Sequence, residues 1–564
     1  MPSDRPWFKH YPPEVPKEFK HEFRPLGDLL RESARKFPDR PATIFFGARM
    51  TYKELDEQAD RLATALHQMG IRKGDRVAAF LPNCPPYVIT YSAVLRLGAV
   101  LVNNNPLYTE RELEHQLTDS GAKVLVFWDL LLPTVQNVRP KAPKVERYIA
   151  ASFKPCLPPL LRLLFPVAEK KIRKERYPNL QKPPAKDSGI ADFAAIIRAT
   201  NPALPKVDIA PGDPALLQYT GGTTGLPKSA VLTHGSIGAN VAQIRAWFYK
   251  DEPGKETAVV IFPLFHAAGM IICFQALSMA TSMILIPRFD RDRPDRFLKA
   301  VQKHRPTTFP GVPTLFNALA NYPGIGKYDL KSVKYCLSGA APMPLEVAHR
   351  WKAATGASLV EVFGLTEASP VTHANPVYGN QKLGSVGVPL PGTDAKIVDS
   401  ADEKTELPPG KEGELIISGP QLMAGYWNRP QESAKALRNG WLYTGDLAKM
   451  DEEGFFYIVD RKKDMIIAGG YNVYPNEIEG ILYEHPKILE AAVIGVKDEY
   501  RGEAPKAFIV LKPGEKATAE EIIAYCKTKL AAYKVPKNIE FRETLPKSVI
   551  GKVLRRELRD EKNA

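Results

Sequence analysis

Residues 219–228 read Tyr219-Thr220-Gly221-Gly222-Thr223-Thr224-Gly225-Leu226-Pro227-Lys228, and they form the most informative segment of the chain. Glycine has no Cβ, so the three glycines let the backbone approach an anion and turn its N–H groups inward. The threonines add hydroxyl donors, and Lys228 adds a positive charge. Because Gly225 is not followed in register by Lys-Ser or Lys-Thr, this is not a Walker A loop. A polar hairpin turn is the alternative, but the density of Gly, Thr and Lys favours a polyphosphate-binding loop of another kind.

On both sides of this loop, short apolar runs rich in strand-forming residues alternate with amphipathic helical stretches. This rhythm predicts an α/β architecture with largely parallel sheets covered on both faces. The clearest predicted strands are Arg76–Leu81, Lys123–Trp128, Ala258–Phe262, Ser282–Ile286 and Lys334–Leu337.

The pattern changes near residue 384. Short strands with Gly and Pro turns then predict a small antiparallel barrel or sheet through residue 460. A charged link, Arg461-Lys462-Lys463-Asp464, follows. Beyond it, strands and helices alternate in a unit of about a hundred residues, which is a typical size for a separate domain. Within that unit, Thr518 with Glu521 three residues later is a capping-box signature for a helix start. We therefore expect a large N-terminal domain (1–460), a hinge (461–464) and a small mobile α+β C-terminal domain (465–564).

Composition narrows the class of protein. At roughly 100–200 residues per domain, 564 residues suggest three or four structural units. The net charge of +14 suits anionic ligands, although a basic soluble surface explains it equally well, and no nucleic-acid module accompanies it. The five cysteines are odd in number and form no CxxC pair, which argues against a disulfide framework or zinc knuckle and favours a reducing compartment. We expect a cytoplasmic protein without nucleic-acid partners.

Two segments bear on membrane association. Residues 257–287 contain no charged side chain, but polar residues, Gly and Pro interrupt the run, so we expect a strand, a helix from Met270 to Ala280 and a second strand rather than a membrane span. The N-terminus has no apolar region typical of a signal peptide. In residues 155–176, the apolar run 157–165 precedes the basic run 170–174. That pairing suits peripheral contact with the inner face of an anionic membrane, and packing against the protein itself is the alternative.

Four further motifs carry chemistry. Val362-Phe363-Gly364-Leu365-Thr366-Glu367 ends in a carboxylate of the kind that binds Mg²⁺. Trp441-Leu442-Tyr443-Thr444-Gly445-Asp446 offers an acid that accepts hydrogen bonds from paired hydroxyls. Pro263-Leu264-Phe265-His266 sets a histidine in an apolar run. Gly551-Lys552 gives a lysine a mobile base, whereas Lys547 and Arg555 beside it are typical of a solvated basic tail.

In this order, the motifs resemble those of the acyl-adenylate-forming, or AMP-binding, superfamily, which includes acyl-CoA synthetases, luciferase-like enzymes and peptide-synthetase adenylation domains. The resemblance covers roughly residues 25–560. It is nearest to bacterial-type long-chain fatty-acid–CoA ligases in Tyr219–Lys228, Tyr471–Glu479 and Phe541–Arg559. The chain departs from the superfamily pattern at Gly221, where Ser is usual, at Ser229, where Gly is usual, and at Phe363, where Tyr is usual.

The resemblance assigns roles residue by residue. It implies that Lys552, His266, Thr224 and Lys228 take part in catalysis, and that Thr223 and Glu367 hold Mg²⁺. The residues implied to bind nucleotide are Thr220, Gly221, Gly222, Thr223, Thr224, Gly225, Lys228, Gly339, Ala340, Ala341, Glu361, Val362, Phe363, Gly364, Thr366, Asp446, Arg461 and Lys552.

The same resemblance implies an acyl tunnel and a moving domain. His266, Gly311, Val312 and Gly339 correspond to the tunnel. Lys463 corresponds to a hinge about which the C-terminal domain rotates between two half-reactions. After rotation, Gly469, Gly470 and Tyr471 face the site and leave room for coenzyme A.

The activity expected from this resemblance is a long-chain fatty-acid–CoA ligase that uses ATP, Mg²⁺ and coenzyme A and passes through an acyl-adenylate. A medium-chain or aryl acid–CoA ligase remains an alternative, because the matching motifs handle the nucleotide rather than the acyl tail. An acyl-AMP ligase that loads a carrier protein, a luciferase-type oxygenase and a non-enzymatic lipid-uptake protein also remain open. The sequence leaves monomer and homodimer equally open.

Overall fold

The computed structural model describes residues 5–176, 189–220, 227–290, 293–468, 471–498, 502–548 and 551–561. Its first large sheet has eight strands and is parallel from β8 to β7, with β9 and β19 antiparallel at one edge. Central β5 is buried at every position, as expected for a parallel sheet covered on both faces. In spatial order the strands are β19 (Gly425–Tyr426), β9 (Lys228–Thr233), β8 (Pro214–Thr220), β4 (Val100–Asn103), β3 (Arg76–Phe80), β5 (Val124–Trp128), β6 (Arg147–Ala151) and β7 (Ile190–Asp192).

The second large sheet has nine strands and is parallel from β14 to β1. In spatial order they are β16 (Val388–Pro389), β15 (Val371–Ala374), β14 (Leu359–Gly364), β13 (Tyr335–Ser338), β12 (Thr308–Gly311), β10 (Thr257–Val260), β11 (Ser282–Leu285), β1 (Pro41–Phe45) and β2 (Ala48–Thr51). The predicted strands in both sheets are present, with bounds shifted by one or two residues. Residues 257–287 form strand, helix and strand, as predicted.

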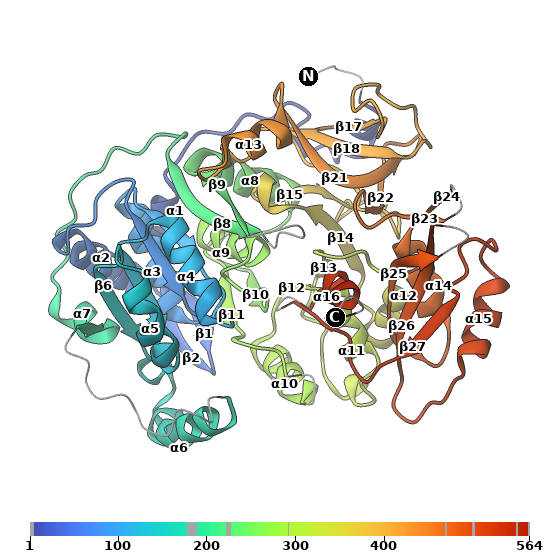
Figure 1. Cartoon of the computed structure of the whole chain (residues 1–564). Helices are drawn as coiled ribbons and strands as arrows, with labels where there is room; N and C mark the ends of the chain where they lie inside the picture. The colour runs from blue at the N-terminus through green and yellow to red at the C-terminus, as the bar shows by residue number, and fades with distance from the viewer. Residues whose placement is uncertain are drawn as a thin grey trace.

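Helices pack between and around the two sheets (Figure 1). Several begin at a threonine whose hydroxyl accepts a hydrogen bond from the amide three residues on, which fixes the helix start; Thr51, Thr109 and Thr233 are examples. The longer helices of this part are α1 (Leu26–Lys36), α2 (Tyr52–Gln68), α3 (Pro85–Arg96), α4 (Glu110–Ser120), α5 (Leu132–Val138), α7 (Phe193–Ala199), α8 (His234–Trp247), α9 (Ala267–Met279), α10 (Pro294–His304), α11 (Pro313–Ala320) and α12 (Leu345–Thr355).

A smaller antiparallel sheet lies across one end of the two large sheets and is orange in Figure 1. Of the two alternatives predicted for this region, a barrel or an open sheet, the structure has the sheet. Its strands are β17 (Asp394–Val398), β18 (Gly413–Ser418), β21 (Trp441–Met450), β20 (Leu437–Arg438) and β22 (Phe456–Arg461), and α13 (Pro430–Ala436) packs beside it.

The C-terminal part forms a separate domain, red in Figure 1. It has two apolar cores of its own, drawn from residues 466–558. The Thr518 hydroxyl accepts a hydrogen bond from the Glu521 amide, so the predicted helix start is confirmed. The elements are β23 (Ile466–Ala468), β24 (Tyr471–Val473), α14 (Pro475–Glu484), β25 (Ile488–Asp498), β26 (Gly502–Leu511), α15 (Ala519–Lys527), β27 (Asn538–Phe541) and α16 (Arg555–Asp560).

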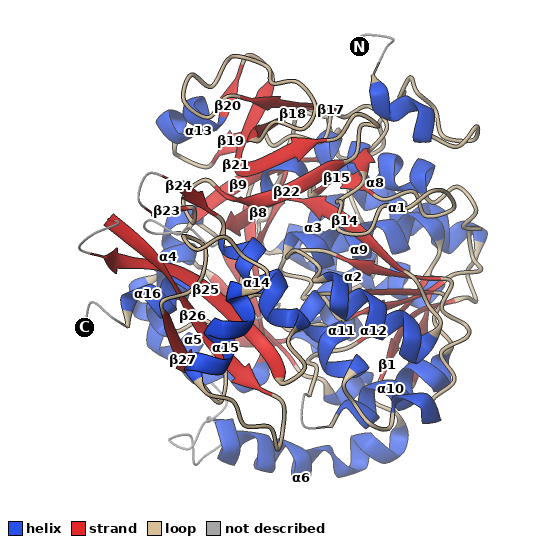
Figure 2. Cartoon of the chain, turned by 90° about the vertical axis from the view of Figure 1, so that its right-hand side faces the viewer, coloured by secondary structure: helices blue, strands red, loops and turns tan. Residues whose placement is uncertain are grey.

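One helix stands apart from these layers. Helix α6 (Pro159–Arg176) lies at the periphery in Figures 1 and 2. Leu163 and Val167 on it are 76% and 73% exposed, whereas Phe165 is buried. No helix in the described part of the chain combines the length and apolarity that a bilayer crossing requires.

Candidate active site

A cavity of about 1390 Å³ opens where the second large sheet, the small sheet and the C-terminal domain meet. It exceeds the roughly 300–1,000 Å³ of pockets that hold one drug-sized ligand. Several lining residues lie at the carboxyl ends of strands. Ser338 and Gly339 lie at the end of β13, and Gly364 lies at the end of β14. The carboxyl edge of a parallel sheet is the usual position for a ligand site in an α/β fold.

The ends of the phosphate-loop segment meet at this cavity. Thr220 and Lys228 are paired across the hairpin of β8 and β9, and the Thr220 hydroxyl donates a hydrogen bond to the Lys228 carbonyl at 3.2 Å. The Lys228 amine forms an ion pair with Glu432 of α13 and lies 5.5 Å from the ring centre of Tyr426. An incoming anion therefore competes with Glu432 for this amine. The predicted contacts Gly221, Gly222, Thr223, Thr224 and Gly225 lie outside the described residues.

Glu367 follows β14 in the short helix η6 (Thr366–Ala368), beside Thr366 on the cavity wall. Its Oε1 accepts a hydrogen bond from the Tyr426 hydroxyl at 2.8 Å. Among the described residues, no group of three or more His, Cys, Asp or Glu side chains is arranged to hold a metal. A single carboxylate fits Mg²⁺, which usually takes one or two carboxylates together with phosphate oxygens and water.

Further residues predicted to bind nucleotide line the same space: Gly339, Ala340, Ala341, Glu361, Val362, Phe363 and Gly364. Glu361 is buried and accepts a hydrogen bond from the Gly384 amide at 3.0 Å. Burial raises the pKa of Glu361 to about 7, so at neutral pH about half of these carboxyls carry a proton. A wall that contains Glu361 can therefore accommodate an uncharged ring of a ligand better than a wall with a permanently charged carboxylate.

Asp446 presents an unsatisfied acceptor. The residue is 2% exposed, and its Oδ1 forms an ion pair with Arg461 Nε at 2.6 Å. Its Oδ2 is buried and accepts no hydrogen bond from any described residue. Burial raises the pKa of Asp446, and Arg461 works against that rise. Since buried acceptors are rarely left unpaired, a hydroxyl-bearing ligand is the natural partner of Oδ2.

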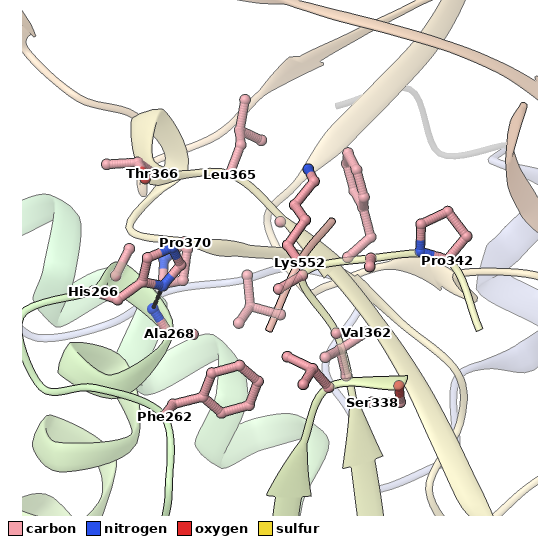
Figure 3. Close-up of a pocket in the computed structure, with 18 of the residues that line it drawn as sticks. Phe262, His266, Ala268, Ser338, Pro342, Val362, Leu365, Thr366, Pro370 and Lys552 are labelled. Carbon is pink, nitrogen blue, oxygen red and sulfur yellow. Dashed lines mark hydrogen bonds between the residues drawn. The ribbon is translucent and has the colours of Figure 1, made fainter. Parts of the chain in front are cut away.

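His266 is the N-cap of α9, and its Nδ1 accepts a hydrogen bond from the Ala268 amide at 3.2 Å (Figure 3). Burial, together with the positive charge of Lys552, lowers the pKa of His266 to about 4. The ring is therefore neutral at physiological pH. Because Nδ1 accepts, the proton lies on Nε2, which is free to donate to a carboxylate.

Buried amides hold the loop that carries His266. Asn83 Nδ2 donates to the Phe262 carbonyl at 3.0 Å, and Asn83 Oδ1 accepts from the Leu264 amide at 2.7 Å. Gln218 Nε2 donates to the Phe265 carbonyl at 2.7 Å. Neither Asn83 nor Gln218 belongs to a local motif, and sequence reasoning missed both.

Lys552 reaches the cavity from the C-terminal domain, as Figure 3 shows. The Thr314 hydroxyl donates a hydrogen bond to the Gly551 carbonyl at 3.1 Å and so links this loop to α11. Gly551 has φ of +83°, and a Cβ there would lie 2.8 Å from Thr314 Oγ1, so only glycine suits the position. Burial and the neighbouring Arg461 lower the pKa of Lys552 to about 8.

Other predicted residues fall at varying distances from the cavity. Lys463 and Val312 line it, but Gly311 lies behind the wall, packed near Leu315. Tyr471 is 59% exposed and stacks on Tyr533 instead of lining the cavity. Gly469 and Gly470 lie outside the described residues.

The expectation that Lys547 and Arg555 form a solvated basic tail is wrong. Lys547 pairs with Glu490, and its side chain is 8% exposed. Arg555 is 15% exposed and lies between Glu479, at 2.8 Å, and Asp460, at 3.2 Å. These acids lie between 57 and 95 residues away in the chain, so no local pattern reveals the pairs.

Comparison with known proteins gives two family matches. The model of the AMP-binding enzyme family matches residues 30–427, and that of the AMP-binding enzyme C-terminal domain matches residues 477–552. A long-chain-fatty-acid–CoA ligase of Bacillus subtilis is 46% identical over 100% of this chain and 99% of its own. A long-chain-fatty-acid–CoA ligase of Escherichia coli is 42% identical over 98% of both chains.

Solved structures agree with the sequence relatives. An anthranilate CoA ligase in complex with anthranoyl-AMP superposes with a TM-score of 0.84 at 27% identity, over 96% of this chain and 98% of that one. The ATP-bound MatB of Rhodopseudomonas palustris gives 0.81 at 29% identity, over 95% and 98%. The α/β fold with a separate C-terminal domain is therefore shared with a CoA ligase crystallised with an adenylate and with the ATP-bound MatB.

Proposed function

The chain belongs to the AMP-binding enzyme family, and from this premise we propose that it is a long-chain fatty-acid–CoA ligase. It is an ATP-dependent, AMP-forming enzyme that joins a carboxylic acid to the thiol of coenzyme A. The observation that carries the proposal is the shared cavity, which is lined by Asp446 with its unpartnered Oδ2, by Lys552 and by the neutral His266, and which continues into a channel with apolar walls.

In the first half-reaction, we propose that an oxygen of the acid attacks the α-phosphorus of ATP and that the bond to pyrophosphate breaks. Two anions must approach, so fixed donors and positive charge lower the barrier. Lys552 bridges the carboxylate and the α-phosphate, Lys228 faces the departing phosphates, and Asp446 Oδ2 accepts from a ribose hydroxyl. Glu367, together with Thr223, would hold Mg²⁺, which when bound would neutralise charge on the phosphate oxygens.

In the second half-reaction, the thiol sulfur of coenzyme A attacks the adenylate carbonyl, and AMP leaves with the bonding pair. His266 acts before this, in the first half-reaction, where its Nε2–H donates a hydrogen bond to an oxygen of the bound acid. Because the ring stays neutral above about pH 4, it does not compete with Lys552 as a cation.

We further propose that the two steps need two orientations of the small domain. Lys552 lines the cavity that the thiol must enter, while Tyr471 on the same domain lies outside the cavity lining and is exposed. Rotation of residues 465–564 against residues 1–460, about Lys463 in the 461–464 link, withdraws Lys552 and brings Gly469, Gly470 and Tyr471 to the cavity. This is a hinge motion of a kind common in ligases and kinases.

Helix α6 supports a proposal about location. Its exposed apolar side chains are Leu160, Leu161, Leu163, Leu164 and Val167. The sequence turns basic directly afterwards, at 170–174. Apolar area followed by positive charge suits insertion into the surface of an anionic membrane, where the acid substrate also partitions.

Product analysis tests the function. The purified full chain, incubated with hexadecanoate, ATP, Mg²⁺ and coenzyme A, should release AMP and pyrophosphate in equal amounts and form hexadecanoyl-CoA. The same reaction with a phosphopantetheinylated carrier protein in place of coenzyme A should be much slower. Transfer to the carrier but not to coenzyme A, or release of ADP instead of AMP, would overturn the proposal.

A further inference from the structure

The cavity continues far beyond the carboxylate site. Glu256 lines it and directly precedes β10, whereas Phe262 lines it and follows that strand. Likewise Tyr335 begins β13, and Gly339 follows its other end. Because these strands are parallel, the cavity reaches from the carboxyl edge of the second sheet to its amino edge.

Helix α9 gives the length of this channel. It runs from beside His266 to Met279, next to Thr281, and residues along it line the cavity throughout. Its 13 residues span about 18 Å at 1.5 Å per residue. An extended chain advances about 1.2 Å per bond, since a residue of three backbone bonds covers about 3.3–3.6 Å. The channel therefore holds about 15 bonds, close to the distance from C1 to C16 of a fatty acid.

The near part of the channel is apolar, whereas its far end combines polar side chains with apolar ones such as Phe248 and Met279. Ile271, Ile272 and Phe262 line the first turns beyond His266. The polar side chains at the far end carry hydroxyls or carboxylates, and they are Asp251, Glu256, Thr281 and Tyr335. A channel built only for a methyl terminus has no use for these groups.

One of them is an unsatisfied acceptor. Glu256 is 3% exposed, and its Oε1 accepts from Lys334 Nζ at 2.6 Å. Its Oε2 is buried and accepts no hydrogen bond of full geometry from the described residues; the Thr307 hydroxyl lies close enough to favour the charged form of Glu256 but donates to the Thr257 carbonyl at 3.1 Å. Gln275 Oε1, farther up α9, is also buried and unpartnered among those residues. Asp251 is satisfied, since it accepts from the hydroxyls of Tyr335 and Tyr378.

Burial opposes ionisation of Glu256, but Lys334 and neighbouring donors outweigh it and hold the pKa of this carboxyl below its usual range. Glu256 is thus an anion at neutral pH. An acceptor of this kind selects a hydrogen-bond donor and repels a second carboxylate.

We propose that the substrates of this ligase include long-chain acids hydroxylated at or near the methyl end, whose hydroxyl donates a hydrogen bond to Glu256 Oε2 at the far end of the channel. The inference rests on the proposed ligase function and names its substrate class. A hydroxyl placed near C6 instead lies beside Ile271 and Ile272, where an unpaired polar group is costly.

Relative kcat/KM values of the full-length enzyme test this inference by coupled detection of AMP. The substrates are hexadecanoate, 16-hydroxyhexadecanoate, 6-hydroxyhexadecanoate and hexadecanedioate. We expect the 16-hydroxy acid to match or exceed hexadecanoate, and the 6-hydroxy acid and the dioate to fall at least about tenfold below it. A 16-hydroxy acid as poor as the 6-hydroxy acid would overturn the inference and leave the ligase function standing. Absence of turnover with every acid would overturn both.

Substitutions of Glu256 test whether this residue causes the preference for the hydroxylated acid. In Glu256→Leu, the ratio of kcat/KM for 16-hydroxyhexadecanoate over hexadecanoate should fall about tenfold, while Glu256→Gln, which keeps an acceptor oxygen, should retain most of that ratio. An unchanged ratio in Glu256→Leu contradicts the assignment. A comparison that needs no variant is 12-hydroxydodecanoate against dodecanoate. Its hydroxyl stops about four bonds short of Glu256, so the shorter hydroxy acid should lose the advantage, and an equal advantage at both lengths counts against the inference.

Discussion

Lys552 is the residue on which the first half-reaction depends most. Its side chain lines the cavity and comes from the C-terminal domain, on a loop fixed by the Thr314–Gly551 hydrogen bond. A positive charge held in place where two anions meet stabilises the transition state more than either substrate alone.

Lys552→Ala should lower acid-dependent exchange of labelled pyrophosphate into ATP by about 10²–10³-fold, the cost of losing one preorganised donor. Thioester formation from supplied hexadecanoyl-adenylate should survive, because the amine has no role in that step. Lys516→Ala, at an exposed position of the same domain, is the control and should leave both half-reactions intact. An equal loss of both half-reactions in Lys552→Ala would show that this lysine does not belong to the first step.

The pKa of Lys552, lowered to about 8 by burial and Arg461, predicts a pH dependence. The amine is charged below that value, so kcat/KM for adenylate formation should be high near pH 7 and fall as pH rises through about 8. His266, with a pKa of about 4, gives no acid limb between pH 5 and 7. In Lys552→Arg the guanidinium stays charged, so the alkaline limb should disappear from the profile of whatever activity remains. An alkaline limb that persists at pH 8 in this variant would assign it to another group.

At the scale of elements, the link 461–464 joins two bodies. β22 ends at Arg461, Lys463 follows in a turn, and β23 begins at Ile466. The Asp464 amide donates to the Arg461 carbonyl at 2.9 Å, which fixes the present turn. The proposed rotation would take place about this turn.

Lys463→Pro should therefore slow thioester formation at least tenfold while adenylate formation stays within about threefold of wild type, because proline fixes φ near −65°. Lys463→Ala removes the same amine but leaves the backbone free, and we expect it to form thioester at least about tenfold faster than the proline variant. Single-turnover measurement of each half-reaction separates the two outcomes. Normal overall turnover by Lys463→Pro would contradict the hinge.

Helix α6 carries a second element-scale prediction. Leu163→Glu with Val167→Glu should abolish flotation of the protein with vesicles of phosphatidylglycerol and phosphatidylethanolamine, because each inserted apolar side chain contributes about 1.5–3 kcal/mol. Leu107→Glu with Ile467→Glu, at positions 56% and 52% exposed elsewhere, is the matched control and should float normally. Deletion of residues 155–176 should act like the first pair. Unchanged flotation after that deletion would remove α6 from membrane contact.

Much of the order of helices and strands could be predicted from the sequence, because it depends on local hydrophobic patterns and helix-capping residues. Buried parallel strands such as Val124–Trp128 are continuous apolar runs, and the start of α15 follows from the Thr518 and Glu521 spacing. What could not be predicted is which distant side chains pair. Glu432 meets Lys228 across 204 residues, and Tyr426 meets Glu367 across 59. The same limit explains why Arg555 was misread as a solvated side chain.

At the scale of the whole molecule, the cavity is assembled from segments that the chain sequence keeps far apart. His266 comes from the second large sheet, Asp446 and Arg461 come from the small sheet, and Lys552 comes from the separate C-terminal domain. The sequence motifs could be assigned roles, but they do not give the length of the channel or the polar groups at its far end. Those features depend on how α9 and β10 lie relative to one another in the folded chain.

The central claim is that the acid is activated by bonding one of its oxygens to the α-phosphorus of ATP. The most direct measurement is to supply hexadecanoate labelled with ¹⁸O in both carboxylate oxygens, together with ATP, Mg²⁺ and coenzyme A, and to weigh the products by mass spectrometry. The account predicts one ¹⁸O atom in each AMP released and none in pyrophosphate. Unlabelled AMP, or ¹⁸O in pyrophosphate or phosphate, would contradict it.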